Sequence, residues 1–140
     1  MREAESTIPV VAEWVAKAEE DLGTAAHLLK LGKSCPAAMV CFHAQQSVEK
    51  YLKAYLVYRG TPFPKTHDIE ELVARLPSSA RPALTVEEQA LLTEYAVGPR
   101  YPGWRDVPLR EARQAVGLAR RVRKHVRLLL PKGILRWRKH

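Results

Sequence analysis

The sequence has few cysteines and no long apolar run, and each shortage excludes a class of protein. Its only cysteines are Cys35 and Cys41, too few for a disulfide framework or a four-ligand zinc site. If both lie in one helix, their Cα atoms are about 9 Å apart, so we expect two reduced thiols. No signal peptide is evident, and no run reaches the ~18 apolar residues of a membrane-spanning helix. We therefore expect a cytoplasmic protein without membrane contact.

Several motifs of catalysis are also missing. The chain has no Gly-rich phosphate loop, no paired-carboxylate metal site and no Ser or Cys nucleophile arrangement. We therefore expect no cofactor and no metal ion, and no metal-dependent or ATP-hydrolysing mechanism. The 140 residues suit a single domain, and a composition of 46% hydrophobic and 27% charged residues predicts a packed core.

Positive charge is concentrated near the C-terminus. The net charge is +8, but residues 105–140 hold 12 Lys and Arg against 2 Asp and Glu, whereas residues 1–104 hold 11 against 13. The last quarter is thus +10 and the remainder −2. A field of this kind favours a partner that carries phosphate or other acidic groups.

Proline and glycine divide the chain into segments with helical periodicity, and no segment alternates with period two. We predict helices over about 9–31, from an N-cap at Ser34 to about Arg59, over 67–76, 85–97 and 109–130. The second is apolar nearly all round, which is typical of the central helix of a bundle. These patterns predict an all-α, up-and-down bundle of four to five helices formed by residues 1–130, followed by a basic tail over 131–140.

The second predicted helix carries one polar stripe at helical spacing, formed by His43, Gln46, Lys50 and Lys53. Unpaired polar groups are costly to bury, so the stripe either lines a site or forms a hydrogen-bonded layer between helices. Both interpretations stay open for His43 and Gln46. We expect Lys50 and Lys53 to be exposed and available to phosphate.

Two further segments combine structural and ligand-binding chemistry. Thr66 is a candidate N-cap of the third helix, and its neighbours Lys65 and His67 are candidate phosphate ligands. The segment with Tyr95, Arg100 and Tyr101 joins aromatic rings to a guanidinium, a combination that suits a base with its phosphate. Packing of the two tyrosines against neighbouring helices is the alternative.

Three segments together resemble the HEPN domain family of small helical proteins. They are Cys-Phe-His-Ala-Gln-Gln-Ser-Val-Glu-Lys-Tyr-Leu-Lys-Ala at 41–54, Lys-Thr-His-Asp at 65–68, and Leu-Thr-Glu-Tyr-Ala-Val at 92–97 with Arg-Tyr-Pro at 100–102. The resemblance implies a five-helix bundle, a homodimer and a minimal nucleotidyltransferase as partner, in an arrangement like that of toxin–antitoxin pairs. It also implies that some members are metal-independent ribonucleases with an Arg, four to six residues, and a His. Surplus apolar positions on the second and last helices also favour a homodimer.

Arg120 and His125 are the one pair with that spacing. Histidine can remove the 2′-hydroxyl proton of RNA and arginine can stabilise the phosphorane. The chain is so rich in arginine that such a match is expected by chance, and a solvated basic face is the alternative.

Three functions follow from the sequence. The first is a HEPN-like module that binds nucleotide or RNA phosphates and acts, as a toxin-type component, with a nucleotidyltransferase partner. The second is a metal-independent endoribonuclease that uses Arg120 and His125 as catalytic residues. The third is a non-catalytic interaction subunit whose basic surface docks on an acidic protein.

Overall fold

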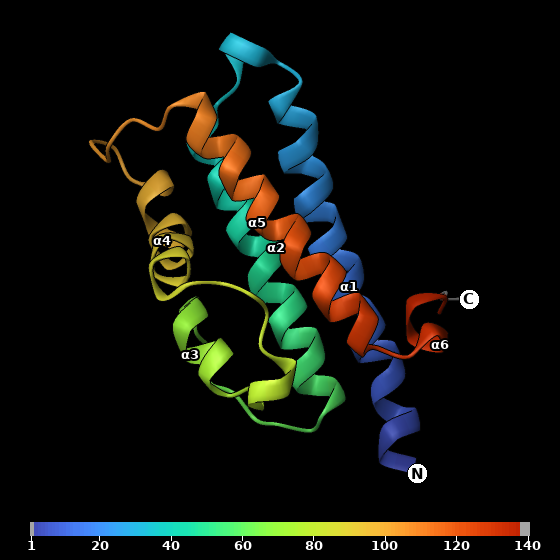
Figure 1. The fold of residues 1–140 in the computed structure, drawn as a ribbon. Helices are drawn as coiled ribbons and strands as arrows, with labels where there is room; N and C mark the ends of the chain where they lie inside the picture. Colours follow the sequence, from blue (N-terminus) through green and yellow to red (C-terminus); the bar gives the residue numbers. More distant parts are fainter. Residues whose placement is uncertain (1, 138–140) are drawn as a thin grey trace.

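The fold is described by a computed structural model that covers the backbone of residues 2–137 and the side chains from residue 7 onward. Its α-helices are α1 (Arg2–Leu29), α2 (Ala37–Tyr58), α3 (Ile69–Ala74), α4 (Val86–Val97), α5 (Leu109–Leu129) and α6 (Lys132–Leu135). No strand occurs in the described residues. The all-α prediction is confirmed, with four long helices and two short ones (Figure 1).

Helix ends agree with the sequence signals at some positions and not at others. Thr85 begins α4 with a capping box, in which Thr85 and Glu88 satisfy each other's backbone N–H groups. Ser34 is not an N-cap, because it lies in a short 3-10 turn and Pro36 takes the cap position of α2. Thr66 does not cap α3 either: Asp68 does, accepting a hydrogen bond from the Glu71 N–H at 3.1 Å.

The central element is α2, which packs against both α1 and α5 (Figure 1). Helices α3 and α4 flank α2 on the side away from α1. Its fully buried side chains include Val48, Tyr51, Leu52 and Leu56, and burial of each such apolar side chain contributes roughly 1.5–3 kcal/mol before the entropy cost. The prediction that this helix is the most buried one is confirmed.

The C-terminal segment is more ordered than a basic tail would suggest. Pro131 separates α5 from α6, and α6 contacts α1 close to the start of the chain (Figure 1). Ile134 is buried in the common core. Part of the segment predicted as a tail therefore folds onto the bundle, and its last three residues lie outside the described part. None of the helices described here is long and apolar enough to cross a membrane.

Candidate nucleic-acid interface

Helix α5 has one apolar face and one cationic face. Its buried positions recur at helical spacing and comprise Ala112, Ala115, Val116, Leu118, Ala119, Val122 and Val126. Its exposed cations are Arg110, Arg113, Arg120, Arg121 and Lys124. Because the buried stripe fixes the rotation of the helix against α2, the remaining positions have to face water. The positive charge seen in the sequence is thereby displayed along one side of the bundle.

Cations gather around an open depression of about 590 Å³ between α1 and α5. Its lining residues are Leu22, Arg120, Arg123, Lys124, Arg127 and Leu128. Leu22 is buried and forms the floor, whereas Leu128 is 79% exposed at the rim. The depression therefore offers several positive groups around a small apolar centre.

Two of these arginines are held by Glu19 of α1. The Arg123 Nε donates to Glu19 Oε1 at 2.6 Å, and Arg127 Nη1 lies 3.5 Å from the same oxygen. The Tyr51 hydroxyl also donates to Glu19. The hydrogen bond to Glu19 raises the pKa of Arg123, so this guanidinium is charged throughout the physiological range. Both arginines are thus pre-oriented by a single carboxylate.

Arg120 and Lys124 differ from them because they have no carboxylate partner. Both side chains are exposed, and neither makes a hydrogen bond or ion pair with any residue in the described part of the chain. Arg121, one position along, bonds to the Ala83 carbonyl at 2.8 Å and to Glu88 at 3.3 Å. Among the residues that line the depression, these two unpaired cations are therefore the groups most available to an incoming anion.

The structure does not bring Arg120 and His125 together within one subunit. Five positions on an α-helix correspond to about 140° of rotation, which places the two side chains on different sides of α5. Arg120 faces the depression, whereas His125 Nε2 lies 2.6 Å from the Ala80 carbonyl oxygen. Because a carbonyl only accepts, this nitrogen carries the proton and cannot act as a base while the bond stands.

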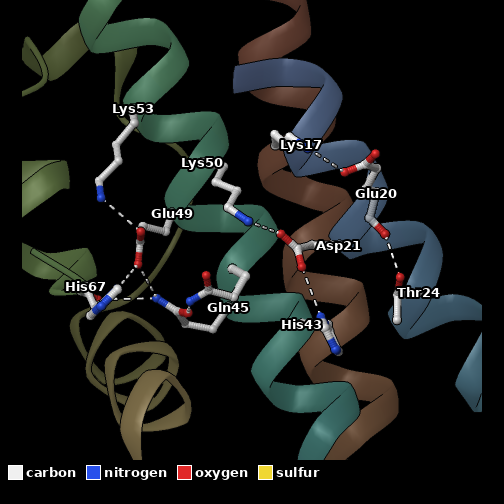
Figure 2. A network of polar contacts seen from close by, with 11 residues as sticks. Lys17, Glu20, Asp21, Thr24, His43, Gln45, Glu49, Lys50, Lys53 and His67 are labelled. Atoms are coloured by element: carbon white, nitrogen blue, oxygen red, sulfur yellow. Dashed lines mark hydrogen bonds and ion pairs between the residues drawn. The ribbon is translucent and has the colours of Figure 1, made fainter. Parts of the chain in front are cut away.

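The polar stripe of α2 lies in two neighbouring networks between helices (Figure 2). In the first, Asp21 of α1 accepts from two residues of α2: His43 Nδ1 at 2.9 Å and Lys50 Nζ at 2.5 Å. All three side chains are mostly covered. His43 and Lys50 therefore already share a carboxylate that joins α1 to α2.

The second network surrounds the buried carboxylate of Glu49 (Figure 2). It accepts from Gln45 at 3.1 Å, from Lys53 Nζ at 2.9 Å and from His67 Nδ1 at 2.7 Å. Gln46 joins it through a 2.6 Å bond to the Gln45 side-chain oxygen. These bonds satisfy the polar groups of the stripe from within the protein.

The expectation that Lys50 and Lys53 are exposed is wrong, since Lys50 is mostly covered and only 7% of Lys53 is accessible. The Lys53 ammonium lies 5.7 Å from the ring centres of both Trp14 and Phe63. The ion pair with Glu49 and these two aromatic faces together compensate the cost of burying the charge.

The remaining candidate ligands are dispersed. Lys65 is exposed, and the His67 ring reaches back to α2. Tyr95 is fully buried and its hydroxyl donates to Glu111, so burial and this bond raise its pKa. Arg100 lies 5.5 Å above the Phe42 ring, and Tyr101 is 62% exposed. Of the two tyrosines, only Tyr101 is accessible to a ligand.

Two residues with structural roles were missed by sequence reasoning. Glu19 falls in the same helical series as the buried residues Ala12, Val15 and Leu22 of α1. An acidic residue at a position that faces the core is the sequence signal that could have identified it. Arg105 bonds to Glu94 at 3.0 Å and to Glu111 at 2.7 Å. Its partners come from two helices joined by an irregular loop, and no periodic pattern marks them.

No group of three or more His, Cys, Asp or Glu side chains in the described ranges could hold a metal ion. The positive groups of the interface are therefore its most distinctive chemistry.

Comparisons with known proteins agree with this architecture. A family model of the HEPN domain matches residues 11–129. A crystal structure of TT1696 from Thermus thermophilus superposes with a TM-score of 0.71 at 29% sequence identity, and the match covers 86% of this chain and 98% of that chain. None of the curated proteins matches significantly. Since the family model spans most of the bundle, the chain belongs to the HEPN domain family.

Proposed function

We propose that this protein is an RNA-binding module whose contact surface is the cationic face of α5 and the depression between α1 and α5. The observation that carries the proposal is the pair of unpaired, exposed cations, Arg120 and Lys124, beside the pre-oriented Arg123 and Arg127. For exposed cations that lack carboxylate partners, the free-energy cost of exchanging water and counterions for phosphate is small. Guanidinium groups in addition donate two parallel hydrogen bonds to one phosphate.

The extent of the surface favours a chain of phosphates over a single one. Arg113 and Arg127 are fourteen positions apart, which is about 21 Å along the helix. Several successive phosphates of a nucleic acid strand can contact cations over such a length. Binding of this kind has a steep salt dependence, because each phosphate contact releases condensed counterions.

Family membership supports the association that we propose with a second copy and with a minimal nucleotidyltransferase, as in toxin–antitoxin pairs. In sedimentation experiments at micromolar concentration we expect a dimer. A monomer under these conditions would contradict the proposed self-association without affecting RNA binding.

The decisive experiment is a salt titration of RNA binding. Fluorescence anisotropy of a labelled single-stranded RNA is measured in EDTA for the wild type, for Arg120→Glu/Lys124→Glu, and for Lys30→Glu/Lys33→Glu. The last variant makes the same change in net charge at exposed lysines near the end of α1. We expect binding to be lost in the first variant and largely kept in the second. Equal losses, or an affinity that does not change with salt, would overturn the proposal.

The same samples test the catalytic alternative. The contact of His125 with the Ala80 carbonyl favours a non-catalytic role within one subunit, so we expect the RNA to stay intact on a denaturing gel. Cleavage that disappears in Arg120→Ala/His125→Ala would instead establish a metal-independent ribonuclease.

A further inference from the structure

A second cavity, of about 370 Å³, opens at the other end of α5. One wall comes from the start of α2 and the residues just before it, and includes Pro36 and Met39. The other comes from the loop between α4 and α5, with Tyr101 and Trp104. Polar groups of Arg105 and Asp106 lie at its edge. The cavity thus combines aromatic and aliphatic side chains with hydrogen-bonding groups.

The loop wall is held in place by its own contacts. Trp104 packs so closely on Gly98 that a Cβ atom at position 98 would overlap its ring. The same ring meets Tyr95 edge to face at 6.3 Å, and the Arg105 guanidinium covers it at 4.8 Å. The loop that carries Tyr101 is therefore held in place by these contacts. The Tyr101 ring is exposed on this loop as a preformed aromatic surface.

The edge of the cavity is suited to the rim of a nucleobase. Asp106 is exposed and makes no hydrogen bond or ion pair with the residues described here. Its carboxylate can accept from base N–H groups while the ring of the base stacks on Tyr101. A phosphate alone would not suit the cavity, since Asp106 repels it and Arg105 is already bonded to two carboxylates.

The cavity also lies next to the start of α5, the helix that carries the cationic face. Val107 is the last lining residue in the chain, and α5 begins at Leu109 with exposed Arg110 in its first turn. Arg120, at the depression, lies eleven positions beyond Leu109, or about 17 Å along the helix. A single strand that crosses the α5 face can therefore reach both places.

We infer that this cavity binds an unstacked nucleobase of single-stranded RNA, with Tyr101 as the stacking platform. The inference rests on the proposed function, in which α5 binds the phosphates of the same strand. Duplex RNA, whose bases are stacked and paired, cannot fill the cavity in this way.

Cys35 lies in the wall of the cavity and supplies a direct test. Cys41 is buried, which raises its thiol pKa to about 12, so a maleimide at pH 7.5 modifies only Cys35. The rate of modification is measured with no ligand, with a single-stranded RNA, and with an abasic ribose-phosphate oligomer of the same length. We expect the RNA to slow the reaction severalfold and the abasic oligomer to leave it unchanged.

A variant series completes the test. We expect Tyr101→Ala to weaken binding of the single-stranded RNA about tenfold, as for the loss of one base–aromatic stack, and Tyr101→Trp to keep it. Neither change alters binding of the abasic oligomer.

The outcomes separate the two proposals. If both oligomers bind equally in all variants and Cys35 stays reactive, the inference about the cavity is wrong and the proposed function stands. If neither oligomer binds, both fail. If Tyr101→Ala disrupts self-association in sedimentation and leaves RNA affinity intact, the cavity is a protein contact and the inference is overturned.

Discussion

The cations of α2 and those of α5 are the same kinds of residue in very different situations. On α2, Lys50 bonds to Asp21 and Lys53 to Glu49, and both are largely covered. On α5, Arg120 and Lys124 are exposed and have no carboxylate partner among the described residues. The difference lies in what each side chain faces, because α2 is surrounded by other helices and α5 has one open side. Charge by itself therefore does not identify a binding surface, and the proposal depends on exposed, unpaired cations that are grouped around one depression.

Helix α1 contributes to both situations through two neighbouring acids. Asp21 faces α2, where it pairs with His43 and Lys50. Glu19 faces α5 and orients Arg123 and Arg127 while leaving room around them. The first acid neutralises its partners between packed helices, and the second holds its partners at an open surface.

The largest expected effect is on stability, from Glu49→Leu. The substitution leaves the Lys53 ammonium buried without its carboxylate, at a cost of about 3–5 kcal/mol in the free energy of unfolding. Glu49→Leu/Lys53→Met should recover most of the loss, because no uncompensated charge remains. Guanidinium denaturation measures both, with Glu20→Ala as control, whose exposed pair with Lys17 is worth less than about 1 kcal/mol. If Glu49→Leu and the control variant are equally stable, the ion pairs of α2 are no more structural than an exposed surface pair, and the contrast between α2 and α5 is wrong.

Next in size is the change in affinity from Arg120→Ala/Lys124→Ala. Loss of two phosphate contacts should make the plot of log K against log salt shallower by about 1.4 and lower the affinity on the order of tenfold at physiological salt. The free energy of unfolding should stay within about 0.5 kcal/mol, because both side chains are exposed. Titration at four salt concentrations and a denaturation curve check the two statements. A destabilised protein with an unchanged slope would mean that these cations are structural.

Asp21→Asn should have a smaller effect, again on stability alone. The amide keeps an acceptor for His43 but loses the charge opposite Lys50, and we expect a loss of about 1 kcal/mol for this partly exposed network. RNA affinity should not fall, since the change removes a negative charge. If affinity falls as much as in the α5 variant, the α2 stripe belongs to the binding surface after all.

The smallest effect is expected in the pH dependence of Glu111→Gln. The hydrogen bond from Arg105 lowers the pKa of Glu111 below its ordinary value of 4.5. Its stabilising contribution is therefore fully present above that value and is lost as the pH falls through the lower pKa of the folded state. Wild type should exceed the variant in stability at pH 7, and the difference should shrink at acidic pH. A difference that is constant between pH 7 and pH 2.5 would contradict this.

Local signals predicted most helices within a few residues, and they predicted the pairing between helices poorly. The start of α1 is the exception, since the helix begins at Arg2 and includes Pro9, where the prediction began it at about residue 9. Proline, glycine and apolar spacing placed α4 at its observed start and end, and α2 and α5 close to theirs. Thr66 and Asp68 are both good caps two positions apart, and only the path of the loop decides that Asp68 caps α3. Pairing across helices is beyond such signals: Glu19 and Arg123 are 104 positions apart. Whether a cation is available to a ligand depends on those pairings. The sequence therefore identifies the candidate cations, and only the fold shows which of them are paired with carboxylates.

Helix geometry alone argues against a shared site for one predicted pair of residues. The spacing of Arg120 and His125 satisfies a pattern of letters, but five positions do not return to one face of a helix. A spacing of seven would have done so.

Glu19 also has a consequence for selectivity among anions. A lone inorganic phosphate that approaches Arg123 and Arg127 has to displace a carboxylate that is tethered beside them at high effective concentration. A polymer of phosphates can bind the unpaired Arg120 and Lys124 at the same time, so its binding depends less on displacing the carboxylate. Under the proposed function, this carboxylate is a built-in competitor, and we expect it to weaken the binding of small anions at Arg123 and Arg127 more than that of an extended chain of phosphates.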